Sequence, residues 1–520
     1  MLRTLSRAAL PAAGASAVGL WAAVTTQNDE WDAYFTPAPT TPKREKIVIL
    51  GSGWAGLQAL RKCAGPNKDI VVVSPRPHFL YTPLLAGSSV GTVALKSACE
   101  PLRDLVDRAA AVAASATFLR AEVRDVDVDG RTVLAKTDDA AVDVSYDKLV
   151  IAVGAAPATF GISGVKEHAL FMKESNDAAK LHARVVGNLE RAAALLAVDA
   201  EKFGDAADAL LRFVVVGGGP TGVELASELA DFRSSDVATR YGDGVASRVK
   251  IVLVEAMPRI LAPFDASLAA VARDHLVSRG IEVRTGCLVT QLASPTRATF
   301  RPSTPRDATP EAKAAAAAAE ASEDVGAVVW AAGIAARPVI ARLCEKLGQK
   351  TARGLEVDDR LRVKAAKGDA FGTVFALGDC ALSGYAPTAQ VAGQQGKYLG
   401  RAIRDGAAGA DDALMAPFAY AHAGSLCCLG SGHAIAQLAA PRAPAFYAWR
   451  GLHAAGKDGD ERAVVGGPAF VLWRSLYFSQ LLSAKTCFSV SSDWLKTLTS
   501  GRDAGAVEPI QRRATDAGLS

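Results

Sequence analysis

Two glycine-rich turns, each following a short apolar run, constrain the fold of this chain more than any other feature. The first run, KIVIL at 46–50, leads into GSGWAG, and the second, RFVVV at 212–216, leads into GGGPTG. Each run predicts a buried parallel strand, and the residues after each turn predict a helix. Because this strand–turn–helix pattern occurs twice, we predict an α/β protein with two Rossmann-like βαβ domains in tandem.

The glycine spacing in both turns is that of a dinucleotide site. The motif residues are Gly51, Gly53 and Gly56 in the first copy, and Gly217, Gly219 and Gly222 in the second. The first glycine makes the tight turn, the second lets a pyrophosphate approach the backbone, and the third lets helix and strand pack closely. The phosphates then lie at a helix N-terminus, which favours anions. We therefore predict two dinucleotide sites.

The second copy has an acidic residue where the ribose of a nicotinamide dinucleotide is expected. The strand at 251–255 ends in Glu255, and a later strand at 328–330 leads to Gly333. A carboxylate at Glu255 can accept hydrogen bonds from both ribose hydroxyls and repels the extra phosphate of NADPH. We expect NADH here, with the connection 233–250 holding more residues than usual before that strand.

The first copy lacks such an acid, and other residues indicate FAD. Its second strand ends in Ser74-Pro75-Arg76, where Ser74 or the backbone could contact the ribose and Arg76 could pair with a phosphate or stack on adenine. The strand at 148–153 ends at Gly154. Farther along, VFAL at 374–377 is followed by Gly378 and Asp379. A carboxylate there can bond a ribityl hydroxyl. After two dinucleotide folds, this Gly-Asp pair predicts FAD in the first site.

A chain of 520 residues is longer than a single domain with one hydrophobic core usually is, so we expect several domains. The predicted segments are 1–43 as presequence and linker, 44–165 and 341–410 as two parts of the FAD domain, 166–340 as the NADH domain, and 411–520 as a C-terminal region. The alanine-rich stretch 308–323 is interpreted as a surface insertion. Near the end, amphipathic helices with large rings predict a membrane interface, a dimer interface or plain core packing.

The remaining composition excludes several classes of protein. The net charge of +4 gives no reason to expect nucleic acid. None of the eight cysteines forms a C-x-x-C pair and the histidines are scattered, so no metal site is predicted. The first 28 residues carry Arg3 and Arg7 without an acid, which is typical of an organellar presequence. The apolar stretch 10–24 is short for a membrane span, so we expect peripheral membrane contact.

Several longer segments resemble one family of flavoproteins. They are ILGSGWAGLQAL, VVSPRPHFLYTPLLAGSSVGTV, VVVGGGPTGVELASELADF, VFALGDCAL, PTAQVAGQQGKYL, PFAYAHAGSLCCLG and LWRSLYFSQLLSAK. Over roughly residues 45–500 the chain is similar to the type II, or alternative, NADH dehydrogenases of mitochondria, which belong to the superfamily with two dinucleotide-binding domains. The SPR-x-x-F-x-x-TPLL and AQ-x-x-x-Q elements are much more specific than the glycines.

The resemblance implies an activity and its location. It implies FAD, NADH as donor and a ubiquinone-type quinone as acceptor, without proton pumping. It also implies peripheral attachment to the mitochondrial inner membrane through C-terminal membrane-docking helices, often as a homodimer. A plastid location is the alternative.

The resemblance also assigns roles to individual residues. It places Gln390 and Gln394 beside the flavin ring and along a quinone tunnel, Arg474 and Tyr477 at the tunnel mouth, and Glu224 near the nicotinamide. Proton delivery to the quinone could use Glu224, Tyr477 or water, and the sequence does not decide among them.

Three alternatives have the same or a related architecture. A disulfide reductase needs a cysteine pair after the first glycine motif, where only Cys63 occurs. A sulfide–quinone oxidoreductase needs cysteines flanking the flavin, for which Cys380 and Cys344 are candidates, but Glu255 favours a nicotinamide donor. A flavin-dependent redox-signalling protein would bind the same cofactors with slow turnover.

Overall fold

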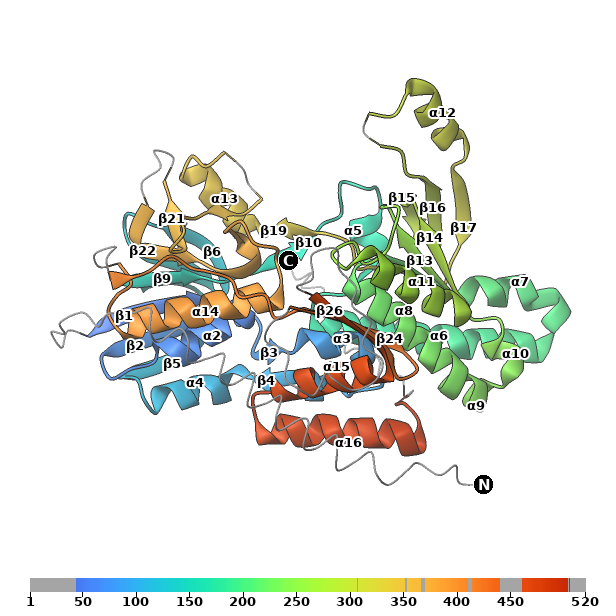
Figure 1. Cartoon of the computed structure of the whole chain (residues 1–520), viewed down its shortest axis with the longest axis horizontal. Coiled ribbons are helices and arrows are strands. Elements are labelled where there is room, and N and C mark those ends of the chain that lie inside the picture. The colour runs from blue at the N-terminus through green and yellow to red at the C-terminus, as the bar shows by residue number, and fades with distance from the viewer. Residues whose placement is uncertain are drawn as a thin grey trace, which may run out of the picture. The chain divides into compact units, whose positions relative to one another are not determined.

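The computed structural model describes residues 44–305, 307–350, 353–365, 370–409, 414–439, 461–503 and 505. The predicted presequence and linker lie outside these residues. The chain divides into two compact units, which Figure 1 shows with their elements labelled. The first contains residues up to Leu80, Cys99–Ala156 and Ile334–Ala423, and the second contains Tyr81–Ala98, Pro157–Gly333 and the chain from Gly424 onward.

The first unit is built on a six-stranded sheet with the strand order β21-β22-β9-β1-β2-β5. Strand β1 (Glu45–Leu50) lies between β2 (Lys68–Val73) and β9 (Lys148–Ile151) and runs parallel to both. Its residues from Ile47 to Leu50 are fully buried, because helices and loops cover both faces of a parallel sheet. The other strands are β5 (Ser115–Leu119), β21 (Arg362–Lys364) and β22 (Ala370–Ala376).

Two helices of the first unit cross in unusually close contact. They are α2 (Trp54–Cys63), which follows the first glycine turn, and α14 (Ala389–Arg404), and they lie side by side in Figure 1. A Cβ at Gly396 would stand 2.3 Å from the Ala55 carbonyl oxygen. A side chain there would force the helices apart, so glycine fixes the position of α14 against the nucleotide-binding turn.

Smaller elements complete the first unit. They are β3 (His78–Leu80), β4 (Cys99–Pro101), α4 (Leu102–Ala110), β6 (Glu122–Asp127), β7 (Thr132–Lys136), β8 (Ala141–Ser145), β10 (Ala155–Pro157), β19 (Ile334–Ala336), α13 (Pro338–Lys346), β20 (Leu355–Glu356), the 3-10 helix η5 (Gly378–Cys380) and β23 (Ala381–Leu382).

The second unit repeats the arrangement with a five-stranded sheet of order β11-β18-β12-β13-β14. Strand β12 (Arg212–Val216) lies between β13 (Lys250–Glu255) and β18 (Ala327–Trp330), again parallel to both. Val214, Val252, Val328 and Trp330 form part of its core. Strands β11 (Leu170–Phe171) and β14 (Ile281–Thr285) close the two edges.

The predicted long connection after the second glycine motif contains three short helical segments. Helix α8 (Pro220–Phe232) follows the turn and continues into the π-helix η4 (Arg233–Val237), α9 (Ala238–Tyr241) and α10 (Asp243–Ala246) before β13 begins. These segments explain why Glu255 comes later than usual. Further helical segments of this unit are η2 (Thr82–Leu84), α3 (Leu85–Ser88), η3 (Leu95–Ala98), α5 (Val165–His168), α6 (Ser175–Val198), α7 (Ala200–Leu210) and α11 (Ala266–Ser278).

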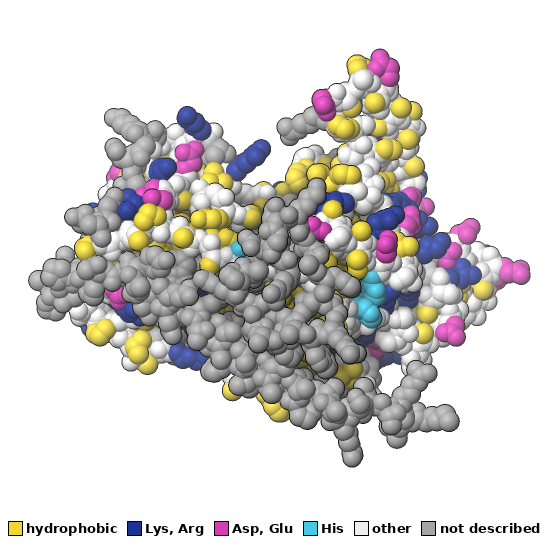
Figure 2. Space-filling view, in the orientation of Figure 1, with side chains coloured by type: hydrophobic (Ala, Val, Ile, Leu, Met, Phe, Trp, Pro, Cys, Tyr) yellow, Lys and Arg dark blue, Asp and Glu magenta, His cyan; other side chains and the backbone are white. Residues whose placement is uncertain are grey.

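The alanine-rich stretch belongs to an antiparallel arm of the second unit. Strands β15 (Cys287–Ser294), β16 (Arg297–Pro302) and β17 (Ala321–Asp324) pair in that order, and α12 (Pro310–Ala318) joins the last two. Of the residues in α12 only Ala316 is buried. Figure 2 shows mostly small apolar and uncharged side chains over this arm, with acidic ones at its tip.

The C-terminal residues form a small sheet and two helices within the second unit. Strands β24 (Ser425–Gly430), β25 (His433–Ala439) and β26 (Glu461–Gly466) pair antiparallel, and α15 (Gly467–Ser479) and α16 (Ala484–Ser500) follow. Helix α8 packs against β24. Apolar side chains are exposed on both helices, namely Val471, Phe478, Phe488, Leu495 and Leu498. Within the described ranges, no helix combines the length and hydropathy needed to span a bilayer.

Candidate functional site

The first glycine turn has the geometry of a diphosphate cradle. Gly51 has a φ of +106°, and a Cβ there would stand 2.3 Å from the Ala152 carbonyl oxygen. A Cβ at Gly56 would stand 2.1 Å from the Gly51 oxygen, whereas one at Gly53 would meet nothing closer than the Arg76 guanidinium at 4.0 Å. The chain's own backbone therefore requires the first and third glycines, and the second leaves the start of α2 open to a ligand.

The residues after β2 lie beside this turn. The Ser74 hydroxyl is buried and lies 3.0 Å from the Ser52 hydroxyl, and the Arg76 backbone N–H donates to it at 3.2 Å. These bonds fix the segment that carries the Arg76 guanidinium next to Gly53. A cation in that place favours the phosphates of a bound dinucleotide.

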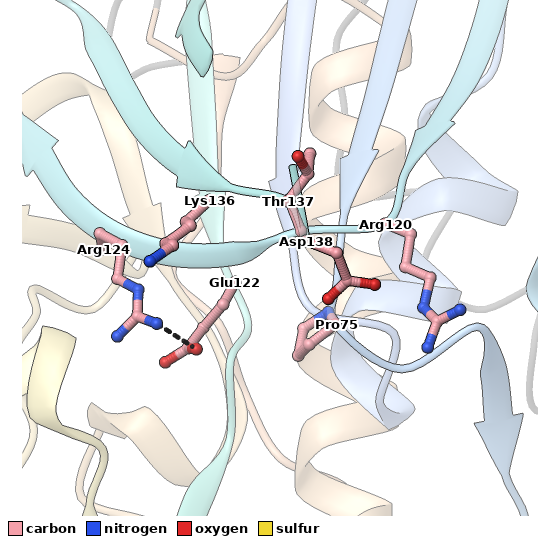
Figure 3. A pocket seen from close by; sticks show the side chains of 8 residues that line it. Pro75, Arg120, Glu122, Arg124, Lys136, Thr137 and Asp138 are labelled. Carbon is pink, nitrogen blue, oxygen red and sulfur yellow. Dashed lines mark ion pairs between the residues drawn. The ribbon is translucent and has the colours of Figure 1, made fainter. Parts of the chain in front are cut away.

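A shallow pocket lies where β2 and β5 end. It is lined by Pro75 and by residues around β6 and β7, among them Arg120 and Lys136 (Figure 3). Glu122 and Arg124, two residues apart on β6, form an ion pair at 2.9 Å in its lining. Ligands of this fold bind outside the carboxyl ends of the strands, so the pocket lies on the side expected for the adenosine half of a dinucleotide.

The predicted Gly-Asp pair is held by a glutamine that the sequence analysis missed. Gly378 has a φ of +67°, and its backbone N–H donates to Gln395 Oε1 at 2.7 Å. Gln395 is fully buried, and its amide nitrogen donates to Ser383 at 2.8 Å. Asp379 follows at the start of η5. Gln395 directly follows the predicted Gln394 on α14, and no pattern in the sequence separates the two.

Gly154 presents open backbone at the end of β9. It has a φ of +65°, and a Cβ built on it would have no atom within 4 Å. Like Gly53, it therefore leaves room at the carboxyl edge of the sheet. Together with Asp379, it gives the first unit a set of groups that fits FAD.

Gln390 and Gln394 lie one turn apart on α14 and bind the same segment of the first unit. Gln394 donates to the Ala421 carbonyl at 2.8 Å and accepts from the Ala421 N–H at 3.0 Å. Gln390 Oε1 accepts from the Tyr420 hydroxyl at 3.0 Å. Both side chains thus fasten residues 420–423 to the helix. Their predicted contact with flavin and quinone stays a prediction.

The second glycine turn reproduces the geometry of the first. Gly217 has a φ of +113°, and a Cβ there would stand 2.8 Å from the Ala331 oxygen. A Cβ at Gly222 would stand 1.9 Å from the Gly217 oxygen, and one at Gly219 would have no atom within 4 Å. The position that a pyrophosphate approaches is again the open one.

Glu255 lies at the carboxyl end of β13 with both carboxylate oxygens oriented by backbone groups. Oε2 accepts from the Gly218 N–H at 2.6 Å, and Oε1 accepts from the Met257 N–H at 2.7 Å. The negative charge is therefore fixed beside the glycine turn. This is the position expected for the ribose of NADH, and a 2′-phosphate there would be repelled.

Glu224 is a buried carboxyl group on α8 that titrates near neutrality. It accepts from the Cys428 backbone N–H and from Trp473 Nε1, both at 3.2 Å. Burial raises its pKa to about 7, and these two hydrogen bonds limit the rise. A group with this pKa can hold or release a proton at physiological pH.

Tyr477 lies in the same cluster of the second unit as Glu224. Its ring packs edge-on against Trp473 with centroids 4.8 Å apart, and its carbonyl accepts from the Tyr81 hydroxyl at 2.8 Å. Burial holds the pKa of both tyrosines well above the ordinary value, so both stay protonated. Trp473 and Tyr81 are contacts that sequence reasoning missed.

Arg474 is held between two aromatic rings of the C-terminal helices. Its guanidinium carbon lies 4.8 Å from the Phe470 centroid and 4.5 Å from that of Trp494. Burial lowers the pKa of Arg474, and the Glu228 carboxylate opposes that shift. The structure thus brings Glu224, Tyr477 and Arg474 together in the second unit, while Gln390 and Gln394 belong to the first.

A buried ionic network joins the residues after α16 to α8, and the sequence analysis did not find it. Arg502 pairs with Asp236 at 3.0 Å and Glu228 at 3.6 Å, and its Nε donates to the Thr92 hydroxyl at 2.8 Å. Because an unpaired buried charge is costly, this network fixes the end of the C-terminal helices within the second unit.

The two cysteines that a sulfide–quinone oxidoreductase would need are unreactive thiols in this structure. Cys380 is fully buried, its Sγ lies 3.2 Å from the Leu377 oxygen, and burial raises its pKa to about 11. Cys344 is buried and bonded to the Gly354 oxygen at 3.4 Å. Neither is a thiolate, which sulfide chemistry requires. In the part of the chain that the structure describes, no group of three or more potential metal ligands occurs.

Comparisons with known proteins decide the family. Residues 45–396 match the pyridine nucleotide-disulphide oxidoreductase family, and residues 422–503 match the NDH2 C-terminal domain. A mitochondrial protein of Schizosaccharomyces pombe, named a probable NADH-ubiquinone oxidoreductase, is 34% identical over 90% of this chain and 84% of its own length. The external alternative NADH-ubiquinone oxidoreductase of Yarrowia lipolytica is 32% identical over 89% and 81%.

The chain belongs to the family of alternative NADH–ubiquinone oxidoreductases. Its fold matches that of NDH2 from Plasmodium falciparum in complex with NADH, with a TM-score of 0.74 and 23% identity over 89% of this chain and 100% of the other. Sulfide:quinone oxidoreductase from Aquifex aeolicus is similar at a TM-score of 0.59 and 15% identity, over 88% and 96%. This family member therefore shares its architecture with several flavoproteins, and the residues of each site separate their chemistries.

Proposed function

We propose that this chain uses FAD to oxidise NADH and reduce a ubiquinone-type quinone, without pumping protons. One observation carries the proposal. Two glycine turns of the same geometry leave their second glycines open, and the Glu255 carboxylate is fixed beside the second of them. The relatives in the family are named for the same reaction.

The first unit has the groups to hold FAD. Gly53 and the start of α2 would face the diphosphate with Arg76 beside them, Ser74 would face the ribose, and Asp379 with Gly154 and Gly378 would face the ribityl chain. The chemistry that bound FAD would supply is hydride acceptance from NADH and transfer of two electrons to the quinone. The chain itself supplies orientation, charge and exclusion of water.

The second unit has the groups to bind NADH. Gly219 and the N-terminus of α8 would face the pyrophosphate, and Glu255 would accept from the adenosine ribose. Gly333 follows β18, next to the glycine turn on the other side from Glu255. NADH would therefore lie across the carboxyl ends of β13, β12 and β18, with its nicotinamide toward Gly333.

Reduction of a quinone to a quinol also needs protons. Among the neighbouring residues Glu224, Trp473 and Tyr477, Glu224 is the best placed proton donor. Its pKa of about 7 lets it exchange a proton, whereas the high pKa of Tyr477 keeps that hydroxyl a hydrogen-bond donor. Arg474 would orient the quinone from the C-terminal helices. Gln390 and Gln394, on α14 of the first unit, would lie beside the flavin ring.

The exposed apolar side chains of α15 and α16 suit a membrane interface. Phe488, Leu495 and Leu498 are each more than 60% exposed, and such side chains become buried when an amphipathic helix docks on a bilayer. We propose peripheral attachment to the mitochondrial inner membrane, where a hydrophobic quinone is available, and a homodimer as the working form.

Reconstitution tests the reaction as a whole. The full chain with FAD is added to phospholipid vesicles that contain ubiquinone and a trapped pH indicator. NADH should be oxidised at the rate at which quinol forms, with no pH change inside the vesicles. Internal pH changes coupled to turnover, or NADH oxidation without quinol, would contradict the proposal.

A further inference from the structure

A strained turn displays an aromatic ring beside the second dinucleotide site. Residues Thr159 to Ile162 form a turn closed by a hydrogen bond from the Ile162 N–H to the Thr159 oxygen at 3.0 Å. Its two central residues, Phe160 and Gly161, have φ of +53° and +73°. Positive φ at both central positions is the pattern of a type I′ turn, for which Asn-Gly is the favoured pair.

Phenylalanine is an unfavourable residue in this place on two counts. A bulky side chain rarely adopts positive φ, and the ring gains little from burial because Phe160 is 66% exposed. Neighbouring contacts hold the turn: Trp330 Nε1 donates to the Ala158 oxygen at 2.8 Å, and Leu292 N–H donates to the Ser163 oxygen at 2.9 Å. Backbone strain of this kind that is fixed by its surroundings tends to occur where a residue has a function.

The ring of Phe160 covers the residue at the end of β18. A Cβ built on Gly333 would stand 2.3 Å from Phe160 Cζ and 3.0 Å from its Cε2, so the ring lies directly on that glycine. Its centroid is also 6.4 Å from that of Trp330. The turn leads into α5, which is labelled in Figure 1.

The order of the strands indicates which part of a bound dinucleotide would lie beside the Phe160 ring. The sheet runs β18-β12-β13, with Glu255 at the end of β13 and the glycine turn at the end of β12. A dinucleotide bound across these ends has its adenosine at Glu255, its pyrophosphate at Gly219 and its nicotinamide riboside at β18. Phe160 lies at this third position.

We infer that Phe160 is a positioning residue that contacts the nicotinamide riboside of NADH. The exposed ring offers a flat apolar surface to the nicotinamide half, and the rigid turn fixes it there before NADH binds. Pre-organised contact of this kind improves both affinity and the orientation needed for hydride transfer. The inference depends on the NADH site proposed above.

Three variants of the full chain with FAD separate the ring from the turn. Phe160→Asn provides the favoured turn residue and removes the ring, and Phe160→Tyr keeps a ring. Arg131→Asn is the matched control, because exposed Arg131 also has positive φ, of +50°, but lies between β6 and β7 of the other unit. For each variant, NAD⁺ affinity, the rate of flavin reduction by NADH and the thermal midpoint are measured.

Phe160→Asn should weaken NAD⁺ binding and slow flavin reduction by roughly five- to tenfold, as expected for loss of an aromatic contact. Its thermal midpoint should not fall, and relief of strain should raise it by roughly 2 °C. Phe160→Tyr and Arg131→Asn should stay within about twofold of the unchanged chain in both binding and rate.

Unchanged binding and flavin reduction in Phe160→Asn would overturn the inference. Equal losses in Phe160→Asn and Phe160→Tyr would do the same, because they would show that the ring itself is not the cause. Reduction of the unaltered flavoprotein by NADH tests the proposed function separately, so failure of one does not mimic failure of the other.

Discussion

At the scale of single residues, the carboxyl groups of Glu255 and Glu224 in the second unit have different roles because their surroundings differ. Glu255 accepts hydrogen bonds from two backbone N–H groups at the end of a strand, which fix the direction of its carboxylate. Glu224 lies among apolar side chains with two weaker hydrogen bonds, so its pKa rises to about 7. One carboxylate is suited to recognition and the other to proton exchange.

Replacing Glu255 tests whether this residue gives the preference for NADH over NADPH. Glu255→Gln should reduce the preference for NADH over NADPH by about tenfold, which corresponds to about 1.4 kcal/mol, because the repelling charge is lost. The ratio of flavin reduction rates with the two donors measures this preference. Glu201→Gln, at an exposed position on α7, should leave the ratio unchanged. A preference that survives in Glu255→Gln would count against the assigned role.

The raised pKa of Glu224 gives stability a defined pH dependence. Because the folded pKa of about 7 exceeds the ordinary value of 4.5, the folded protein binds the extra proton between these values. Stability therefore falls as pH rises from 4.5 to 7, by up to about 3 kcal/mol, and stays lower above. Glu224→Gln removes this loss.

The thermal midpoint of Glu224→Gln relative to the original chain should thus rise between about pH 5 and about pH 8. Glu167→Gln, at an exposed position on α5, serves as the control and should follow the original chain throughout. Parallel curves for Glu224→Gln and the original chain would show that Glu224 is not shifted as described.

At the scale of elements, each nucleotide-binding turn divides its glycines into those the fold needs and one the ligand needs. Gly217 and Gly222 are constrained by backbone atoms closer than 3 Å, whereas Gly219 faces open space. The same division occurs at Gly51, Gly56 and Gly53. Folding and binding can therefore be separated by substitution within one turn.

Alanine at Gly219 should affect NADH binding, and alanine at Gly222 should affect the stability of the fold. Gly219→Ala should keep the free energy of unfolding within about 1 kcal/mol of the original but weaken NADH binding, since the new methyl group occupies the pyrophosphate's approach. Gly222→Ala should lose more than about 3 kcal/mol because its Cβ meets a backbone oxygen. Denaturant unfolding and NADH titration measure the two effects. Similar loss of stability in both variants would refute this division.

The C-terminal helices carry a prediction about membranes. The double variant Leu495→Glu and Leu498→Glu should reduce cosedimentation with phospholipid vesicles at least about tenfold, because two exposed apolar anchors on α16 are lost. Val198→Glu is the matched control, since Val198 is 77% exposed on α6. Equal loss in the control, or undiminished binding of the double variant, would argue against docking through α16.

The sequence predicted the elements of the nucleotide sites because their signals are local. Strand, glycine turn and helix are contiguous, so β1 with α2 and β12 with α8 followed directly from hydrophobic runs and glycine spacing. Gln395 was missed because the first two turns of α14 contain three glutamines and sequence alone does not show which faces Gly378. The Arg502 network joins residues more than 260 positions apart, and no local pattern reveals such a pairing.

At the scale of the whole molecule, two copies of one fold were adapted to different ligands. The first unit keeps Arg76 beside its turn and adds the Gly-Asp pair from a distant segment, while the second keeps Glu255 and gains the C-terminal sheet and helices. The sequence analysis treated residues 411–520 as a separate region. The structure groups the described residues from Gly424 onward with the second unit, because α8 packs on β24 and Arg502 binds α8 side chains.

The central claim is that one bound flavin receives electrons from NADH and passes them to a quinone. Anaerobic stopped-flow spectroscopy of the purified full chain tests it most directly. NADH should bleach the oxidised flavin absorbance faster than steady-state turnover, NADPH should do so far more slowly, and a ubiquinone analogue added next should restore the absorbance. A chain that carries no flavin, or a reduced flavin that the quinone does not reoxidise, would contradict the account.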